Sequence, residues 1–194
     1  MQGLAMSIAL AGCLIGALTA GMLADRLGRK SLLLVSAFIF ATTAYGTGAF
    51  DTFTPFLVIR FLGGIAIGIA SGLSPMYIAE VAPASVRGKL VSLNQLTIVV
   101  GILGAQIVNW LLVSDDTAWN IERAWRWMFW AAAFPACAFL LLALFIPESP
   151  RWLAMKGRTE KAFATLTQIG GKEYAAGEMR AFEQAEAEKQ SQGG

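Results

Sequence analysis

The chain has 194 residues, of which 56% are hydrophobic and only 14% are charged, and its formal net charge is +2. Soluble globular domains carry about 25% charged residues, so this composition, with a mean hydropathy of +0.59, predicts a protein embedded in a lipid bilayer. A net charge this small does not indicate a nucleic-acid partner. The sequence contains no histidine, which excludes Ser-His-Asp and Cys-His catalysis and the common histidine zinc sites. We therefore expect neither an enzyme nor a bound metal or cofactor.

Five apolar segments are long enough to cross a membrane, at residues 3–24, 31–50, 54–78, 90–113 and 126–146. A helix needs about 20 apolar residues to span the hydrocarbon core, so residues 1–146 are predicted to form a transmembrane bundle. Residues 147–194 are charged and rich in Ala, Glu and Lys, with Thr159 as a candidate helix start and Gly170-Gly171 as a helix stop. This tail is predicted to form short cytosolic helices, and the whole chain an all-α membrane protein.

The run DRLGRK at residues 25–30 lies between the first two spans and sets the orientation. Lys and Arg accumulate in cytoplasmic loops, and the first loop, the third loop and the tail hold twelve of the fifteen Lys and Arg residues. This distribution predicts a cytoplasmic C-terminus and, across five spans, an N-terminus outside. Because no leader precedes Met1, we expect that a preceding span is missing and that the chain is a fragment.

Small residues recur at intervals of four in three of the predicted spans. In lipid, helices associate largely through close backbone approach at small residues. These positions therefore predict a compact bundle; they are Gly12, Gly16 and Ala20, then Gly64, Gly68 and Gly72, then Thr97, Gly101 and Ala105.

Arg60 is the basic residue buried within a predicted span, about six residues from the outer end of the third. Intramembrane ionisable residues usually face a cavity or a partner. A long side chain near a helix end can also reach the interface. The sequence alone leaves both interpretations open, and no acid in the middle of any predicted span is available as a partner.

The fourth span carries a row of amide side chains. At about 100° per residue, Gln95, Ile102, Gln106 and Asn109 fall within about 40° of one line along the helix. Amides are unfavourable in hydrocarbon unless they are paired. The row therefore faces other helices, where it would form structural hydrogen bonds, or a wet cavity, where it suits a hydroxyl-rich ligand.

Several motifs together resemble the sugar porter family of the major facilitator superfamily. The resemblance covers essentially the whole chain and corresponds to spans two to six of a twelve-span carrier, with the start of its central cytosolic linker. The stretch from Arg60 to Gln95 is the most specific part. The matching motifs are GMLADRLGRK at residues 21–30, RFLGG at 60–64, SPMYIAE at 74–80, PASVRGK at 83–89, NQ at 94–95, WRWM at 125–128 and PESPRWL at 147–153.

The resemblance implies a role for each matching residue. Gln95, Ile102 and Gln106 would lie at the sugar site, although Ile102 departs from a Gln found there in some proton-coupled members. Arg60 would face an Asp of the first span and couple transport to a proton, and Asp25 would sit against a helix N-terminus of the other half. The resemblance also implies a cytoplasmic charge network that holds the outward-open state, made of Asp25, Arg26, Arg29, Glu80, Arg87, Glu148 and Arg151.

These implications predict part of a secondary active sugar transporter of a bacterial inner membrane that works by alternating access, with sugar:proton symport. Its partners would be a monosaccharide-type substrate, a proton, and the missing first span and C-terminal half of the same carrier. The alternatives are a carrier of another polar solute, such as a polyol or an organic acid, and a small multi-span structural or assembly protein that functions as it stands.

Overall fold

The computed structural model describes residues 2–50, 52–113 and 123–192, so Met1 and most of the loop before the last span lie outside it. Five of the helices in these ranges are long and apolar enough to cross a membrane, which confirms the predicted all-α membrane fold. They are α1 (Gln2–Leu27), α2 (Arg29–Ala49), α3 (Phe53–Val81), α4 (Ala84–Val113) and α6 (Ala124–Phe145). Two more helices follow, α7 (Pro150–Met155) and α8 (Thr159–Gln192).

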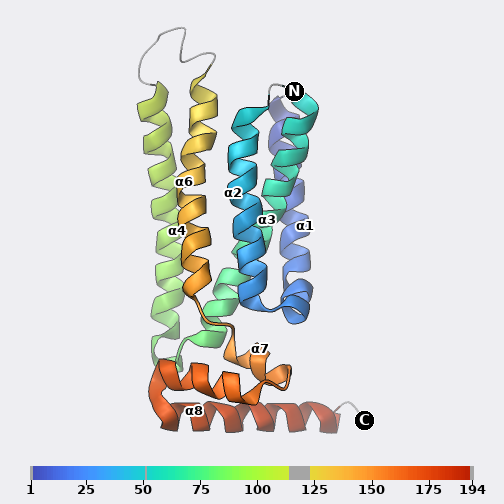
Figure 1. Cartoon of the computed structure of the whole chain (residues 1–194), viewed down its shortest axis with the longest axis vertical. Helices are drawn as coiled ribbons and strands as arrows, with labels where there is room; N and C mark the ends of the chain where they lie inside the picture. The colour runs from blue at the N-terminus through green and yellow to red at the C-terminus, as the bar shows by residue number, and fades with distance from the viewer. Residues whose placement is uncertain (1, 51, 114–122, 193–194) are drawn as a thin grey trace.

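The five long helices run side by side, and α7 and α8 lie across one end of the bundle (Figure 1). Helix α1 packs along α3, and α2 packs against both α3 and α6. The turn between α1 and α2 lies at the same end as α7 and α8, whereas the N-terminus lies at the opposite end (Figure 1). The charged run at residues 25–30 and the charged tail therefore lie at one end of the bundle.

Glycines bring α1 and α3 into backbone contact. A Cβ atom added to Gly12 or Gly16 would collide with a backbone carbonyl of α3, and one added to Gly64 or Gly68 would collide with a carbonyl of α1. Each helix thus presents small residues to the other at intervals of four, as close packing in lipid requires. The close packing that the small residues predict is therefore present where α1 meets α3.

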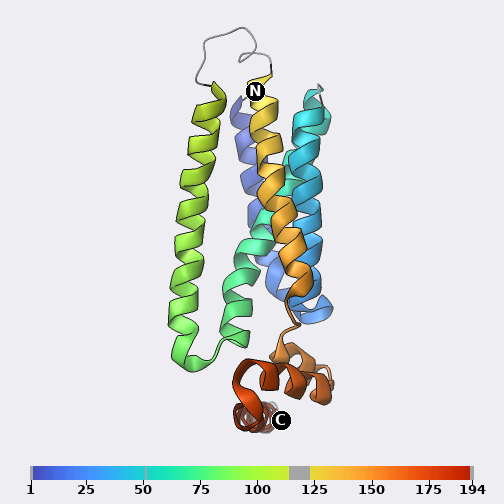
Figure 2. The ribbon, with the colours of Figure 1, turned by 60° about the vertical axis from the view of Figure 1, so that its left-hand side comes forward.

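Helix α4 stands apart from the rest of the bundle along most of its length (Figure 2). None of its residues is buried. A Cβ atom on Gly101 would meet nothing within 4 Å among the described residues. The small-residue stripe predicted for this helix therefore has no packing partner at Gly101 in the part of the chain that the structure describes.

The last two helices form a small core of their own. Gly171 interrupts α8 with a φ of 85°, a left-handed conformation that glycine adopts without the steric cost of a Cβ atom. This break, at the predicted helix stop, lets the second part of α8 fold back onto the first. The buried residues of this core are Trp152, Leu153, Ala162, Leu166, Ala175 and Met179.

We predict that replacing Gly68 by Ala destabilises the bundle by about 1–3 kcal/mol, because the added methyl group must push apart two backbones. Unfolding of the purified chain by sodium dodecyl sulfate, followed by circular dichroism, measures this loss. Gly104→Ala is the matched control, since a Cβ atom there meets nothing within 4 Å among the described residues. Equal stability of the two variants would contradict the packing of α1 on α3.

Candidate functional site

Arg29 is the centre of a charge cluster at the end of the bundle nearest α7. Its side chain is buried, and it forms a two-pronged ion pair with Glu80, in which Nε and Nη2 each lie 2.9 Å from a carboxylate oxygen. Nη1 donates to the backbone carbonyl of Ala24 at 3.1 Å, and Nη2 lies 3.0 Å from Asp25. Arginine suits this position because its planar donors match a carboxylate bidentately. The turn between α1 and α2 is thereby tied to the end of α3.

Glu148 supplies the cap of α2 from a segment more than a hundred residues away. Its Oε1 accepts hydrogen bonds from the backbone N–H groups of Arg29 and Lys30, each at 2.9 Å, and of Ser149 at 3.0 Å. A carboxylate at a helix N-terminus accepts hydrogen bonds from N–H groups that have no partner within the helix. It is also stabilised by the positive end of the helix dipole. Gly28 makes the approach possible, because it has a φ of 95° and a Cβ atom there would lie 2.5 Å from Oε2 of Glu148.

Two residues of the PESPRWL motif complete the cluster, although sequence reasoning did not assign them a role. Ser149 donates its hydroxyl to Oε2 of Glu80 at 2.6 Å and caps α7 by accepting from the N–H of Trp152. The indole N–H of Trp152 donates to the carbonyl of Asp25 at 3.1 Å. A signal for Ser149 was present, since Ser followed by Pro is a typical start of a helix.

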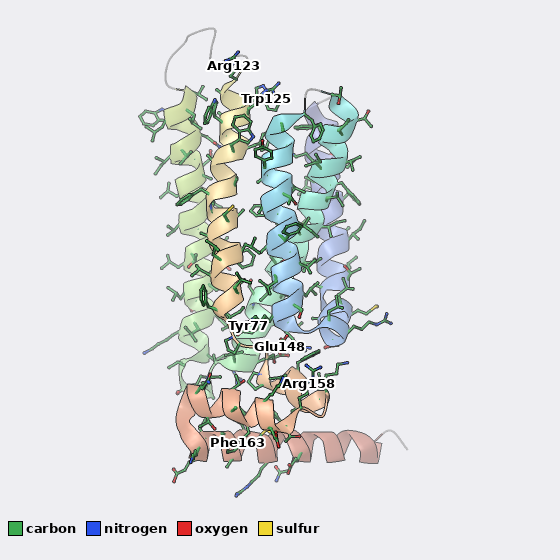
Figure 3. All side chains as sticks on the ribbon, viewed as in Figure 1. Tyr77, Arg123, Trp125, Glu148, Arg158 and Phe163 are labelled. Atoms are coloured by element: carbon green, nitrogen blue, oxygen red, sulfur yellow. The ribbon has the colours of Figure 1, made fainter. Side chains whose placement is uncertain are left out.

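Two further hydrogen bonds join α2 and α3 to the end of α6 and to the segment that follows it. Lys30 donates from Nζ to the carbonyl of Leu144 at 2.9 Å, and the hydroxyl of Tyr77 donates to the carbonyl of Pro147 at 2.9 Å. Figure 3 shows Tyr77 and Glu148 close to this junction. The end of the bundle near α7 is therefore held by contacts between α1, α2, α3 and the linker to α7.

The predicted charge network is only partly assembled within the described chain. Asp25, Arg29, Glu80 and Glu148 lie together as described above. Arg26, Arg87 and Arg151 are exposed and form no ion pair among the described residues; Arg87 donates to the carbonyl of Ala82 at 3.3 Å. The role of the network in transport stays a prediction.

Arg60 lies at membrane depth and lines a cavity of about 490 Å³ to which α1, α2, α3, α4 and α6 all contribute residues. Its Cζ atom lies 5.0 Å from the centre of the Phe129 ring, a cation–π distance. Its Nε atom is buried and has no hydrogen-bond partner among the described residues. Buried polar atoms are nearly always hydrogen-bonded, so the Nε atom of this guanidinium is an unused donor among the described residues.

The amide row of α4 divides between this cavity and open surface. Asn109 lines the cavity with Arg60. Gln95, Ile102 and Gln106 are exposed and outside the cavity lining. Because all four residues share one line of the helix, the face that meets the cavity at Asn109 continues along α4 with no described helix covering it.

These features define a multi-pass helical membrane protein of the transporter class, with a tied charge cluster at one end and an arginine at membrane depth. A family model described as "Sugar (and other) transporter" matches residues 1–193. The chain belongs to this family.

Named relatives are similar over most of this chain. The glucose transport protein of Synechocystis sp. is 44% identical over 177 residues, which are 88% of this chain and 38% of that protein. The D-xylose-proton symporter of Escherichia coli strain K12 is 39% identical over 194 residues, covering 90% of this chain and 40% of the symporter. The arabinose-proton symporter of Bacillus subtilis is 37% identical over 94% of this chain and 40% of that symporter. The chain thus spans about two fifths of the length of these relatives.

Solved structures agree with the fold. The proton:xylose symporter XylE of the major facilitator superfamily, bound to 6-bromo-6-deoxy-D-glucose, matches with a TM-score of 0.92 at 36% identity, over 99% of this chain and 44% of that chain. A partially occluded inward open form of XylE from E. coli matches with a TM-score of 0.90, over 97% of this chain and 49% of that chain. The five spans therefore have the major facilitator arrangement.

We predict that Arg29→Met lowers the free energy of unfolding by about 3–5 kcal/mol, because it leaves the buried carboxylate of Glu80 without its cation. Thermal unfolding of the purified chain in detergent measures the loss. The matched control is Arg26→Met, which removes an exposed arginine three residues earlier and is expected to change little. A similar response of both variants would contradict a stabilising role for the buried pair.

Proposed function

We propose that the chain is part of a secondary active sugar transporter that catalyses sugar:proton symport by alternating access in a bacterial inner membrane. The observation that carries the proposal is the polar face of α4 together with Arg60, which both meet space that no described helix fills. The names of the relatives support the substrate class, since three of them are sugar-proton symporters or a glucose transporter. Transport itself belongs to the full-length carrier.

The sugar site lies along the amide face of α4. Gln95 and Gln106 can each donate to and accept from a sugar hydroxyl, and Ile102 offers an apolar contact between them. In carriers built from two repeats, the substrate binds near the middle of the membrane at the interface between the repeats. An exposed row of amides on a membrane helix is costly in lipid, which supports a second half of the carrier on this side.

Arg60 is the proton-coupling residue in this proposal. A guanidinium at membrane depth whose buried Nε donor is unused is satisfied best by a carboxylate at the same depth. Protonation of that carboxylate removes the ion pair and loosens the two helices that bear the partners. The carboxylate would come from the first span of the carrier.

The charge cluster around Arg29 acts as the cytoplasmic latch. It fixes the end of the N-terminal half-bundle, and the exposed Arg26, Arg87 and Arg151 extend it toward the C-terminal half. Asp25 keeps an exposed carboxylate, with a side chain 65% accessible, which is suited to a helix N-terminus of that half. With this end in the cytoplasm, the N-terminus of the chain lies outside, in agreement with the distribution of Lys and Arg.

We predict that Gln95→Ala in the full-length carrier lowers the apparent affinity for sugar about tenfold, because a buried sugar hydroxyl loses a hydrogen-bond partner worth about 1–2 kcal/mol. Uptake of radiolabelled sugar by proteoliposomes measures this change. Thr42→Val is the matched control, since Thr42 is an exposed polar residue of α2 whose hydroxyl donates to carbonyls of its own helix. Unchanged affinity of the Gln95 variant would refute the binding role.

We predict that Arg60→Leu abolishes proton-driven accumulation of sugar while exchange of labelled for unlabelled sugar continues. Exchange needs no net proton movement, so the comparison separates coupling from binding. Proteoliposomes with and without an imposed pH gradient provide both measurements, and Arg60→Lys tests whether charge alone is sufficient. Normal uphill accumulation by the leucine variant would indicate that Arg60 only reaches toward the interface.

A further inference from the structure

A second cavity, of about 390 Å³, lies at the end of the bundle near α7, between the start of α2, α7 and the first turns of α8. Its wall includes the cations of Arg158 and Lys161, the hydroxyl-bearing Ser31, the carboxylate-bearing Glu148 and the indole of Trp152. Figure 3 shows Arg158 and Glu148 in this region, between the bundle and α8. The cavity is separate from the one that contains Arg60.

Both cations at this cavity are available to a ligand. Neither Arg158 nor Lys161 forms an ion pair with a carboxylate among the described residues, whereas Arg29 a short distance away is fully paired. The backbone of Arg158 is nevertheless fixed, because its N–H donates to the carbonyl of Leu153 at 2.9 Å and its carbonyl accepts from Ala162 at 3.1 Å. Its guanidinium carbon lies 5.9 Å from the centre of the Trp152 ring. The side chain therefore starts from an anchored position at the cavity edge.

The carboxylate in the wall does not cancel this positive charge. Glu148 already accepts three backbone hydrogen bonds through Oε1, two of them at the N-terminus of α2, so its charge is compensated there. It can still accept a hydroxyl group. The hydroxyl of Ser31 has no hydrogen-bond partner among the described residues and is exposed. The lining of the cavity thus combines two cations with partners for hydroxyl groups.

We propose that this cavity binds a phosphate ester that also carries free hydroxyl groups. The phosphate would lie between Arg158, which can donate two parallel hydrogen bonds, and Lys161. The start of α8 at Thr159 adds the positive end of a helix dipole. The hydroxyl groups would meet Ser31 and Glu148. Two sources have this chemistry: the headgroup of phosphatidylglycerol and a soluble sugar phosphate.

This site uses none of the residues proposed for sugar binding or for proton coupling. The latch contributes only Glu148, which would meet a ligand hydroxyl. A failure of the phosphate site would therefore leave the transport proposal unaffected, and a failure of transport would leave this site unaffected.

The test uses the full chain in nanodiscs. In discs of phosphatidylcholine alone, glucose 6-phosphate, glycerol 3-phosphate and inorganic phosphate are titrated by calorimetry. In discs with added phosphatidylglycerol, native mass spectrometry measures retention of that lipid. The double variant Arg158→Gln, Lys161→Gln is compared with the double variant Lys172→Gln, Arg180→Gln, which removes two exposed cations from the same helix α8 outside the cavity.

We expect the cavity variant to lose at least tenfold in affinity or lipid retention and the control variant to lose less than twofold. Ser31→Ala is expected to lower the affinity for glucose 6-phosphate and to leave the affinity for inorganic phosphate unchanged. If the cavity variant does not fold, Ala164→Leu fills the cavity without changing charge and is expected to give the same loss. Binding of the soluble esters identifies a free metabolite, and retention of phosphatidylglycerol alone identifies the lipid. No binding of any probe, or equal losses in the cavity and control variants, would overturn the proposal.

Discussion

A buried guanidinium without a counter-charge would be strongly destabilising, and this constraint organises the end of the bundle near α7. Arg29 is 4% exposed, so its counter-charges must be supplied by other segments of the protein. Glu80, at the end of α3, binds the guanidinium of Arg29. Glu148, in the linker after α6, accepts a hydrogen bond from the backbone N–H of Arg29. Three segments far apart in the sequence are therefore fixed by one residue. The position of α7 and the site beside it follow from that junction.

The rest of the bundle shows a contrast between closed and open surfaces. Helices α1 and α3 approach until their backbones touch at glycines such as Gly12 and Gly68, and that interface cannot slide without collisions. Helix α4 has no buried residue in the described chain. The α1–α3 contact is therefore fixed, whereas the surface of α4 is open. In the proposed carrier, these helices would move as a unit against further helices that meet α4.

Sequence reasoning predicted those features that depend on local periodicity. Runs of apolar residues predicted the five spans, and small residues at intervals of four predicted close helix packing, although not that α1 and α3 would be the helices in contact. The roles of Gly28 and Ser149 were not predicted, because each depends on a carboxylate brought from a distant segment: Glu148 for Gly28 and Glu80 for Ser149. The helical line through Gln95 and Asn109 predicted a shared polar face, of which only Asn109 lines the cavity, because a single helix carries no information on what covers each part of its surface.

The molecule contains two kinds of cation that have no carboxylate partner among the described residues. Arg60 has a buried Nε atom at membrane depth, where an unsatisfied polar group has no water to bind and the cost is continuous. In the proposed carrier, its partner is a carboxylate that stays paired with Arg60 until it is protonated. Arg158 and Lys161 are exposed outside the membrane spans, and water stabilises them when no ligand is present. A cation that water stabilises in the absence of a ligand suits reversible binding. A cation that needs a constant partner suits the proton-dependent switch of the proposed carrier.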